Sequence, residues 1–356
     1  MLFDYWHDMH VFSLLHGHDG SPLGQEYLIN DSGEVSPAYG AKTHGALSGN
    51  TTSSTNSPSP APKLVGSSDG LRIDLIWDSS VANAPTGFKR AIIDAAKYYT
   101  TLFSNDEVIN IDVGYGEIDG SPLASNALGE SESYGYLTNY ATVTHVLAND
   151  GFTFSATNEP TGSQFFVTSA EAKTLGLISP SSTAVDGYIG FSNLSGTGFS
   201  WNRAADADGS NSGTGSSQFD LQSVALHEMS EVMGRIGMEG EIVNGKATYT
   251  PLDLFNYQSH GVLELSSNGG DFSVNNGMTD LGAYNDASVN GGDIVDWASV
   301  ASPTQSSTLG LPSGVNVYDA YDAFAFPGYN GDVSQSDILE DAALGYRLTP
   351  AGTAAV

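Results

Sequence analysis

One helical segment, Leu221 to Met233, places acidic side chains among residues that normally form a protein core. Asp220 can cap the start of this helix and Gly234 can end it. Its apolar side is formed by Leu221, Val224, Ala225, Val232 and Met233. Glu231 stands among these apolar residues, and a carboxylate buried there requires a cation or a proton. The fold must therefore supply that partner, and a metal ion would meet the requirement.

The spacing of the polar residues in this helix is that of a metal site. His227 and Glu231 are four residues apart, so a helix places both on one face, one turn above the other. Glu228 is offset by about a quarter turn and can reach what the pair holds. This is the geometry of the His-Glu-x-x-His zinc helix, with Glu231 at the second histidine position. The carboxylate makes the site more anionic, so another divalent transition metal also fits; a polar stripe on an amphipathic helix is the competing interpretation.

The helix resembles that of a known family. Ala225 to Arg235 is similar to the segment His-Glu-Ile-Ser-Glu-Val-Met-Gly-Arg of bacterial zincin-like metalloproteases, which are related to the metzincins. Further similar segments are Pro251 to Phe255 with Tyr257, Gly292 to Asp293, Asp296 to Ala298, Asp322 to Ala325 and Leu344 to Tyr346. The similarity extends from about Leu71 to Tyr346. It implies an exported metalloendopeptidase with an α/β zincin core.

The third metal ligand is not fixed by the helix. The metzincin pattern is His-Glu-x-x-His-x-x-Gly-x-x-His, and Gly237 stands where its third histidine would be. The resemblance places an aspartate at Asp253, which is therefore the predicted third ligand, and His260 is the alternative. Glu239 and Glu241 are further candidates. A turn or helix-cap role is the competing interpretation for Asp253.

The chemistry assigns roles if the site is catalytic. The predicted metal ligands are His227, Glu231 and Asp253. Glu228 would take a proton from the metal-activated water and deliver it to the leaving amine. Tyr257, or alternatively Tyr249, would donate a hydrogen bond to the oxyanion, although a tyrosine beside an apolar run commonly packs in the core. Two carboxylate ligands would raise the pKa of the bound water relative to a three-histidine site.

Composition excludes several classes of function. The 356 residues contain 11 Lys and Arg against 41 Asp and Glu, a net charge of −30, which argues against nucleic acid or an anionic membrane as partner. The absence of cysteine excludes disulfides, thiolate metal sites and cysteine nucleophiles. No apolar run approaches the ~20 residues that span a bilayer. The Gly- and Ser-rich, Lys-poor composition is typical of a secreted or cell-surface protein, although the N-terminus is a poor secretory signal.

The chain divides into three predicted parts. Residues 1–70 are expected to be a flexible leader, linker or propeptide-like segment, because 45–70 is rich in Ser, Thr, Asn, Pro and Gly. Residues 71–236 form a zincin-like N-terminal subdomain that ends in the metal-binding helix. Residues 237–356 form a loop-rich C-terminal subdomain that completes the site. The predicted fold class is α/β (α+β), with a small mixed sheet beside the helix.

The first ordered elements are predicted to form a βαβ unit. Alternating apolar residues predict a strand over Leu71 to Trp77, and helical spacing predicts a helix over Phe88 to Phe103. A second strand follows over Val108 to Tyr115. Further predicted elements are a helix near Tyr136 to Asn149, strands at Gln164 to Val167 and Val185 to Ser192, and a helix over Asp337 to Tyr346. Glycines in the strand at Val185 to Ser192 suggest an edge position.

Three classes of function fit these features. The favoured one is a metal-dependent endopeptidase, with zinc or another divalent transition metal, that acts on protein or peptide substrates outside the cell. The alternative is a non-catalytic, zincin-derived surface protein stabilised by calcium at Asp206 to Ser210, or at Asp293 and Asp296. A metal-dependent hydrolase of other amides is a third possibility. The sequence does not predict an oligomeric state.

Overall fold

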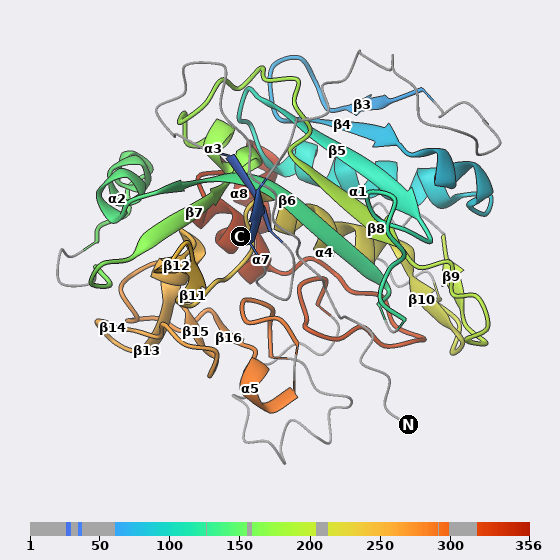
Figure 1. Ribbon diagram of the computed structural model, residues 1–356. Coiled ribbons are helices and arrows are strands. Elements are labelled where there is room, and N and C mark those ends of the chain that lie inside the picture. Colours follow the sequence, from blue (N-terminus) through green and yellow to red (C-terminus); the bar gives the residue numbers. More distant parts are fainter. Residues whose placement is uncertain are drawn as a thin grey trace.

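The computed structural model describes residues 61–356 apart from 126, 155–158, 204–212, 291 and 299–318, together with the backbone of two earlier strands (Figure 1). The described part is a mixed α/β fold built on one large sheet. Its strands follow in the spatial order β3 (Lys63–Val65), β4 (Arg72–Trp77), β5 (Val108–Tyr115), β8 (Gly187–Phe191), β6 (Gly129–Thr138), β7 (Gln164–Thr168), β12 (Lys246–Tyr249) and β11 (Glu241–Val243). The pairs β4/β5, β5/β8 and β7/β12 are parallel, whereas β6 is antiparallel to both β7 and β8.

The predicted βαβ unit is present. Strand β4 has strictly alternating burial and pairs in parallel with β5, with Arg72 beside Val108. Helix α1 (Phe88–Leu102) connects the two strands, and its apolar stripe is buried. The period-2 and helical patterns therefore located these three elements correctly: β4 alternates in burial, α1 buries its apolar stripe, and β5 buries Ile109, Ile111 and Val113 as predicted.

Strand β8 occupies a central position, so the predicted edge position was wrong. It lies between β5 and β6, and all five of its residues are buried. A Cβ atom at Gly187 would lie 2.5 Å from the Glu132 carbonyl oxygen and 2.8 Å from the Val232 side chain. The glycines in this strand therefore allow close packing of neighbouring backbone and helix, which a sequence cannot distinguish from strand weakening.

Strand β6 has no clear sequence signal, yet its first eight residues are buried. Gly129, Ser131 and Ser133 alternate along it and face the helix that carries His227. A Cβ at Gly129 would lie 2.1 Å from Glu228 Oε1, and Ser131 Oγ donates to Glu231 Oε2 at 2.7 Å. Small residues on this face let the helix lie close to the sheet.

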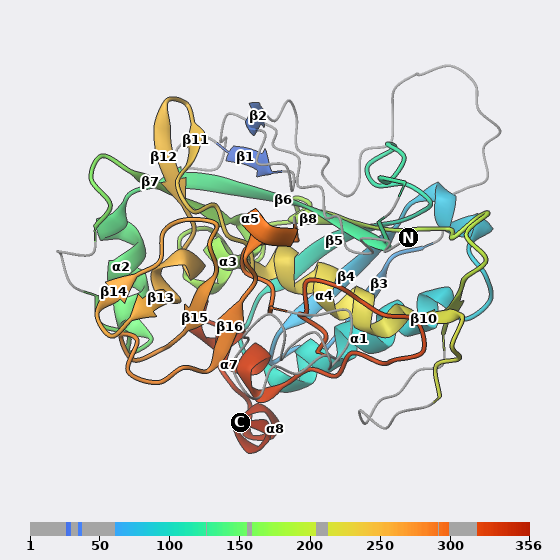
Figure 2. The same ribbon diagram turned by 90° about the horizontal axis from the view of Figure 1, so that it is seen from below.

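That helix is α4 (Leu221–Met233), and its limits match the prediction. The Asp220 side chain accepts from the Gln222 N–H, and Gly234 ends the helix with a φ of 125°. Every residue of α4 is buried. Figure 2 shows α4 between the sheet and the C-terminal segments that carry β16 and α7.

The chain after residue 237 contributes to two sheets. Strand β12 extends the large sheet by pairing with β7, and a second sheet has the order β14-β13-β15-β16. The elements of this part are η3 (Leu252–Phe255), β13 (Asn256–Ser259), β14 (Val262–Leu263), β15 (Gly270–Phe272), β16 (Gly282–Tyr284), α5 (Ala287–Asn290), α7 (Gln335–Ala343) and α8 (Pro350–Ala355). The large sheet includes strands from each of the three predicted parts, residues 1–70, 71–236 and 237–356.

Of the remaining elements, β1 and β2 extend the large sheet and the others lie around it. They are β1 (Glu26–Ile29), β2 (Val35–Pro37), η1 (Ser79–Asn83), α2 (Tyr140–Asn149), α3 (Ser169–Thr174), β9 (Ser200–Asn202) and β10 (Gln218–Asp220). Strand β1 pairs antiparallel with β6 over Ser133 to Tyr136. Among the described helices, none is both long enough and apolar enough to cross a membrane.

Candidate metal centre

Three side chains with metal-ligating atoms lie together beside the C-terminal half of α4, the helix that contains the His-Glu-x-x-Glu motif. His227 and Glu231 come from α4, and Asp296 comes from the segment after α5. One ligand atom from each lies within 4.8 Å of the other two. His227 Nε2 is 3.3 Å from Glu231 Oε1 and 3.5 Å from Asp296 Oδ1. The helix therefore presents its two candidate ligands on one face, as their spacing of four predicted.

These distances are suited to a small divalent cation. Ligands bound tetrahedrally at zinc distances lie about 3.4 Å from one another. His227 and Asp296 are fully buried and Glu231 is 1% exposed, so water provides little solvation for either carboxylate. Buried acids held together without an equal number of cations are expected to bind one or to take up a proton.

The His227 ring is oriented by a backbone group. Its Nδ1 lies 2.9 Å from the carbonyl oxygen of Ala320, and because a carbonyl only accepts, Nδ1 carries the hydrogen. Nε2 then faces the carboxylates of Glu231 and Asp296. This is the arrangement of a metal-binding histidine whose other nitrogen is fixed by a hydrogen bond. Burial opposes protonation of His227, but Asp296 and Glu231 outweigh it and raise its pKa.

Arg235 supplies a positive charge to the same carboxylates. Its guanidinium contacts Asp296 Oδ1 through Nη1, and Nη2 lies 3.3 Å from Glu231 Oε1. The guanidinium also lies over the Tyr321 ring, 4.5 Å from its centre, and Nε donates to Ser230 Oγ at 2.7 Å. One arginine faces two carboxylates, so the group has a formal charge of −1 with a neutral histidine. A divalent cation would bring this charge to +1.

The ligand atoms that are not used in hydrogen bonds are of the kinds that bind a metal ion. Asp296 Oδ2 is buried and has no hydrogen-bond partner in the described part of the chain. Glu231 is fixed through its other oxygen by Ser131, a partner of the kind that orients metal ligands. A histidine nitrogen and carboxylate oxygens are ligands for zinc and for similar divalent transition metals.

Glu228 lies beside this group but on the adjacent face of α4. It is fully buried, and its carboxyl is packed over Gly129 at the start of β6. The quarter-turn offset expected from the sequence therefore directs Glu228 toward the sheet. Glu228 follows His227 directly in α4.

Asp253, the predicted third ligand, lies in a different setting. Its Oδ2 accepts hydrogen bonds from the backbone N–H groups of Met238, Glu239 and Thr250, at 3.2, 3.2 and 2.8 Å. Burial raises its pKa to about 6, against the lowering effect of these bonds. The group of ligand atoms around His227 contains Asp296 in its place. Asp253 joins the loops on either side of β11 and β12.

The other predicted site residues are dispersed. His260 is exposed in the turn between β13 and β14. Tyr257 is buried in β13, where burial and Tyr140 raise its pKa to about 12. Tyr249 is buried at the end of β12, and Glu241 is exposed at the start of β11. Within the described part of the chain, neither tyrosine hydroxyl forms a hydrogen bond with His227, Glu231 or Asp296.

The sequence analysis includes Asp296 and Arg235 but predicts neither as part of the metal centre. Asp296 belonged to the Asp296–Ala298 segment of the family resemblance and to the calcium alternative with Asp293. Arg235 ended the helix motif without an assigned role. Nothing in residue spacing links position 296 to position 227, because sheet pairing and loop packing join them. The calcium alternative at 206–210 lies outside the described residues.

Comparisons with known proteins add no family to this geometry. No protein-family model matches the chain, and no curated protein or solved structure matches it.

Proposed function

We propose that the protein is a metal-dependent endopeptidase, with zinc as the first candidate among divalent transition metals. The observation that carries this proposal is the convergence of His227, Glu231 and Asp296 within 4.8 Å in a buried group. A mixed sheet with the ligand-bearing helix packed on it is compatible with the zincin-like core implied by the resemblance. The resemblance implies protein or peptide substrates, and the Gly- and Ser-rich, Lys-poor composition favours action outside the cell.

The residues have distinct roles in this proposal. A bound ion would polarise the scissile carbonyl and lower the pKa of a water molecule. Glu228 would be the general base that takes up the proton of that water and the general acid that passes it to the leaving amine. Ala320 and Ser131 keep His227 and Glu231 in ligating orientations. Arg235 offsets the second carboxylate, so the pKa of the water need not rise as two anionic ligands alone would require.

A second candidate is a non-catalytic surface protein that retains this group for stability. The observation in its favour is Arg235, whose guanidinium contacts both Glu231 and Asp296. A fully buried cation of this kind can stabilise the two carboxylates without any metal. In that case Glu228 would have no chemical role.

The decisive experiment compares wild-type protein with Glu228→Gln. Metal content is measured by elemental analysis after dialysis, and hydrolysis is measured on unfolded casein. The endopeptidase proposal expects about one equivalent of metal in both proteins and a loss of activity of at least about 100-fold in the variant. Asp253→Asn is the matched control and should retain metal. Absence of bound metal from the wild type, or absence of casein hydrolysis by it, would favour the non-catalytic protein, whereas equal hydrolysis by Glu228→Gln would overturn the role of Glu228.

A further inference from the structure

Two tyrosine hydroxyls and one aspartate form a buried chain of polar contacts beside the metal centre. Tyr99 is on α1, Asp341 is on α7, and Tyr321 lies in the segment before α7, each at most 1% exposed. The Tyr99 hydroxyl oxygen lies 2.6 Å from the Leu226 carbonyl oxygen and 2.8 Å from the hydroxyl oxygen of Tyr321. The Tyr321 hydroxyl oxygen lies 2.9 Å from Asp341 Oδ2. The chain therefore runs from α7 to the backbone of α4 at the residue before His227.

The three contacts need more hydrogens than the two hydroxyls supply. Each contact is short enough for a hydrogen bond, so each requires one hydrogen between its two oxygens. A tyrosine hydroxyl has one hydrogen, and a backbone carbonyl has none. The third hydrogen must therefore come from the one remaining group, the carboxyl of Asp341. In this order Asp341 donates to Tyr321, and Tyr321 donates to Tyr99. The Tyr99 hydroxyl then donates to the Leu226 carbonyl.

The immediate surroundings of Asp341 favour the same protonated form. Its Oδ1 is buried and has no hydrogen-bond partner in the described residues, which a neutral carboxyl tolerates better than a carboxylate. Burial raises the pKa of Asp341 to about 7, against the lowering effects of Tyr321 and Arg235. When the Tyr321 hydrogen goes to Tyr99, Tyr321 no longer offers a donor to Asp341. The pKa of Asp341 then lies higher still.

The other charged and titratable groups around Asp341 come from several elements. The cation that faces it is Arg235, just after α4, and this guanidinium already contacts Glu231 and Asp296. The remaining groups are carboxyls of α7 and phenols of α1 and the C-terminal segments, namely Asp337, Glu340, Tyr98, Tyr99, Tyr321 and Tyr346. None of these adds a positive charge that would favour an ionised Asp341.

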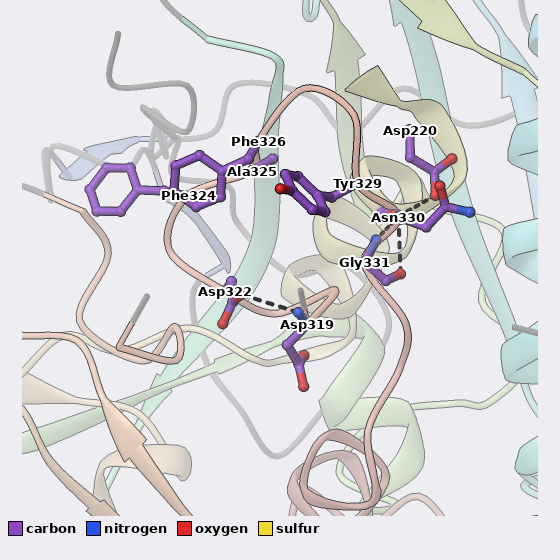
Figure 3. Close-up of a pocket in the computed structure, with 10 residues that line it drawn as sticks. Asp220, Asp319, Asp322, Phe324, Ala325, Phe326, Tyr329, Asn330 and Gly331 are labelled. Carbon is purple, nitrogen blue, oxygen red and sulfur yellow. Dashed lines mark hydrogen bonds between the residues drawn. The ribbon is translucent and has the colours of Figure 1, made fainter. Parts of the chain in front are cut away.

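Tyr321 belongs to the turn that holds the candidate metal-binding histidine. Figure 3 shows Asp319 and Asp322, which lie at the two ends of this turn; the Asp319 N–H donates to Asp322 Oδ2 at 3.1 Å. Between them, the Ala320 carbonyl oxygen lies 2.9 Å from His227 Nδ1. Tyr321 follows Ala320 directly, so a movement of its side chain bears on the group that orients His227.

We propose that Asp341 is a protonated carboxylic acid in the folded protein, and that its hydrogen sets the direction of the hydroxyl chain and keeps the Ala320 turn against α4. Ionisation removes one hydrogen, so one contact becomes an approach of two oxygens with no hydrogen between them. The contact between Tyr99 and Tyr321 should lengthen first, because α1 and α4 are packed together whereas Tyr321 is in a turn. Asp341 is thus a positioning residue for His227 whose effect is lost as pH rises. It acts with or without a bound ion, so its test is separate from that of the peptidase.

The first test compares wild type with Asp341→Asn by urea unfolding at two pH values. The asparagine amide can donate to Tyr321 as the neutral acid does, but it cannot ionise. The folded state holds the Asp341 proton more tightly than the unfolded chain, so the wild type should lose stability relative to the variant as pH rises from about 4 to about 8. Asp69→Asn removes an exposed carboxylate and should show little such change. If Asp341→Asn instead loses stability relative to the wild type over this range, the proposal is overturned.

A second variant keeps the test valid if Asp341→Asn does not fold. Tyr99→Phe removes two of the three contacts and keeps the ring, so the Tyr321 hydrogen becomes free to stabilise an ionised Asp341. The pKa of Asp341 should fall by about 1–2 pH units, and the loss of stability between about pH 4 and pH 8 should be smaller than in wild type. An equal or larger loss would contradict the proposed chain, because removal of a polar neighbour without it keeps or raises the pKa of a buried acid.

The effect on the turn is measured by hydrogen exchange in the full chain. The Trp297 N–H donates to the Tyr321 carbonyl at 2.8 Å, and the Tyr321 N–H donates to Asp319 Oδ1 at 2.9 Å. After correction for intrinsic exchange rates, protection of both amides should fall above about pH 7 in wild type and stay constant in Asp341→Asn. Constant protection in both proteins would overturn the positioning role of Asp341.

Discussion

Two buried ion-pair groups in this fold differ in how their charges balance. Near α3, Lys173 Nζ lies 2.5 Å from Asp186 Oδ2 and also donates to the carbonyls of Val108 and Ser182. Asp186 accepts from Ser169 Oγ and from the Asn110 N–H, each at 2.8 Å. One ammonium meets one carboxylate, and each of these atoms has a partner.

The group around Arg235 has an excess of acid. One guanidinium faces Glu231 and Asp296, His227 Nε2 points at the same oxygens, and Asp296 Oδ2 has no described hydrogen-bond partner. The contrast teaches that burial alone does not mark a functional site. A balanced pair stabilises the fold, whereas a group with surplus negative charge and a free donor atom is suited to a further cation.

The largest difference between the two groups should appear in metal binding. His227→Ala and Asp296→Ala each remove a ligand, so bound zinc should fall from about one equivalent to near zero. Asp186→Asn removes a buried carboxylate that is already paired and should leave metal content unchanged in the folded fraction. Elemental analysis after gel filtration measures both. Metal retained in Asp296→Ala would return Asp253 to consideration as the third ligand.

The next difference concerns rescue of stability. Arg235→Met and Lys173→Met each leave a buried carboxylate without its cation, so each should lower the free energy of unfolding by about 3–5 kcal/mol. Saturating zinc should restore much of the loss in Arg235→Met, because the ion replaces the missing charge and binds only the folded state. It should restore none in Lys173→Met. Urea unfolding with and without zinc gives the comparison. Equal responses of the two variants to zinc would show that the group around Arg235 binds no more zinc than the Lys173–Asp186 pair.

A smaller effect is expected at the partner of a ligand. Ser131→Ala removes the hydrogen bond to Glu231 Oε2 and should weaken zinc binding about 10–100-fold. Ser169→Ala removes the corresponding hydroxyl from Asp186 and provides the matched control. Competition with a chromogenic chelator measures the affinity. An unchanged zinc affinity in Ser131→Ala would mean that the hydrogen bond from Ser131 does not help to orient Glu231 as a metal ligand.

The smallest effect concerns an acid outside both groups. Burial, followed by Asp253 and Glu264, raises the pKa of Glu239 to about 9 from 4.5. The folded state therefore holds this proton more tightly, and the free energy of unfolding should fall as pH rises from 4.5 to about 9. Glu239→Gln cannot ionise and should be more stable than wild type at pH 8 by on the order of 1 kcal/mol, with little difference near pH 4. Urea unfolding at the two pH values checks this; a destabilised variant at pH 8 would show that a cation already compensates Glu239.

The sequence predicted those parts of the fold that are governed by local patterns. Strand β4 alternates in burial, helix α1 buries its apolar stripe, and β5 buries the alternating residues Ile109, Ile111 and Val113, so the periodicity of these elements predicted them. The cap and the terminal glycine of α4 predicted its ends. Strand β6 was missed because Glu130, Ser131, Glu132 and Ser133 are polar yet buried. Their burial depends on neighbouring strands and on α4, none of which is encoded in the local pattern.

The candidate site likewise has a part that local spacing predicts and a part that it does not. His227, Glu228 and Glu231 lie in one helix, where spacing fixes their relative directions. Asp296 lies 65 positions beyond Glu231, and the contacts that place it are the bonds from Asn285 N–H to its carbonyl and from Trp297 N–H to Tyr321. Such contacts arise only when the C-terminal segments fold over α4. A motif can therefore name the ligands of one element, but the ligand from another element requires the structure.

The carbonyl of Ala320 has a consequence for how the C-terminal segments would respond to a bound ion. It holds the His227 ring, and the backbone at Asp322, two residues further on, forms a bridge with Trp297, the neighbour of Asp296. An ion held by His227 and Asp296 would therefore tie the segments around Ala320 and Asp296 to α4. Because the ion would bind only the folded arrangement, its binding free energy would be coupled to the docking of these segments, and removal of the ion would favour their release from α4.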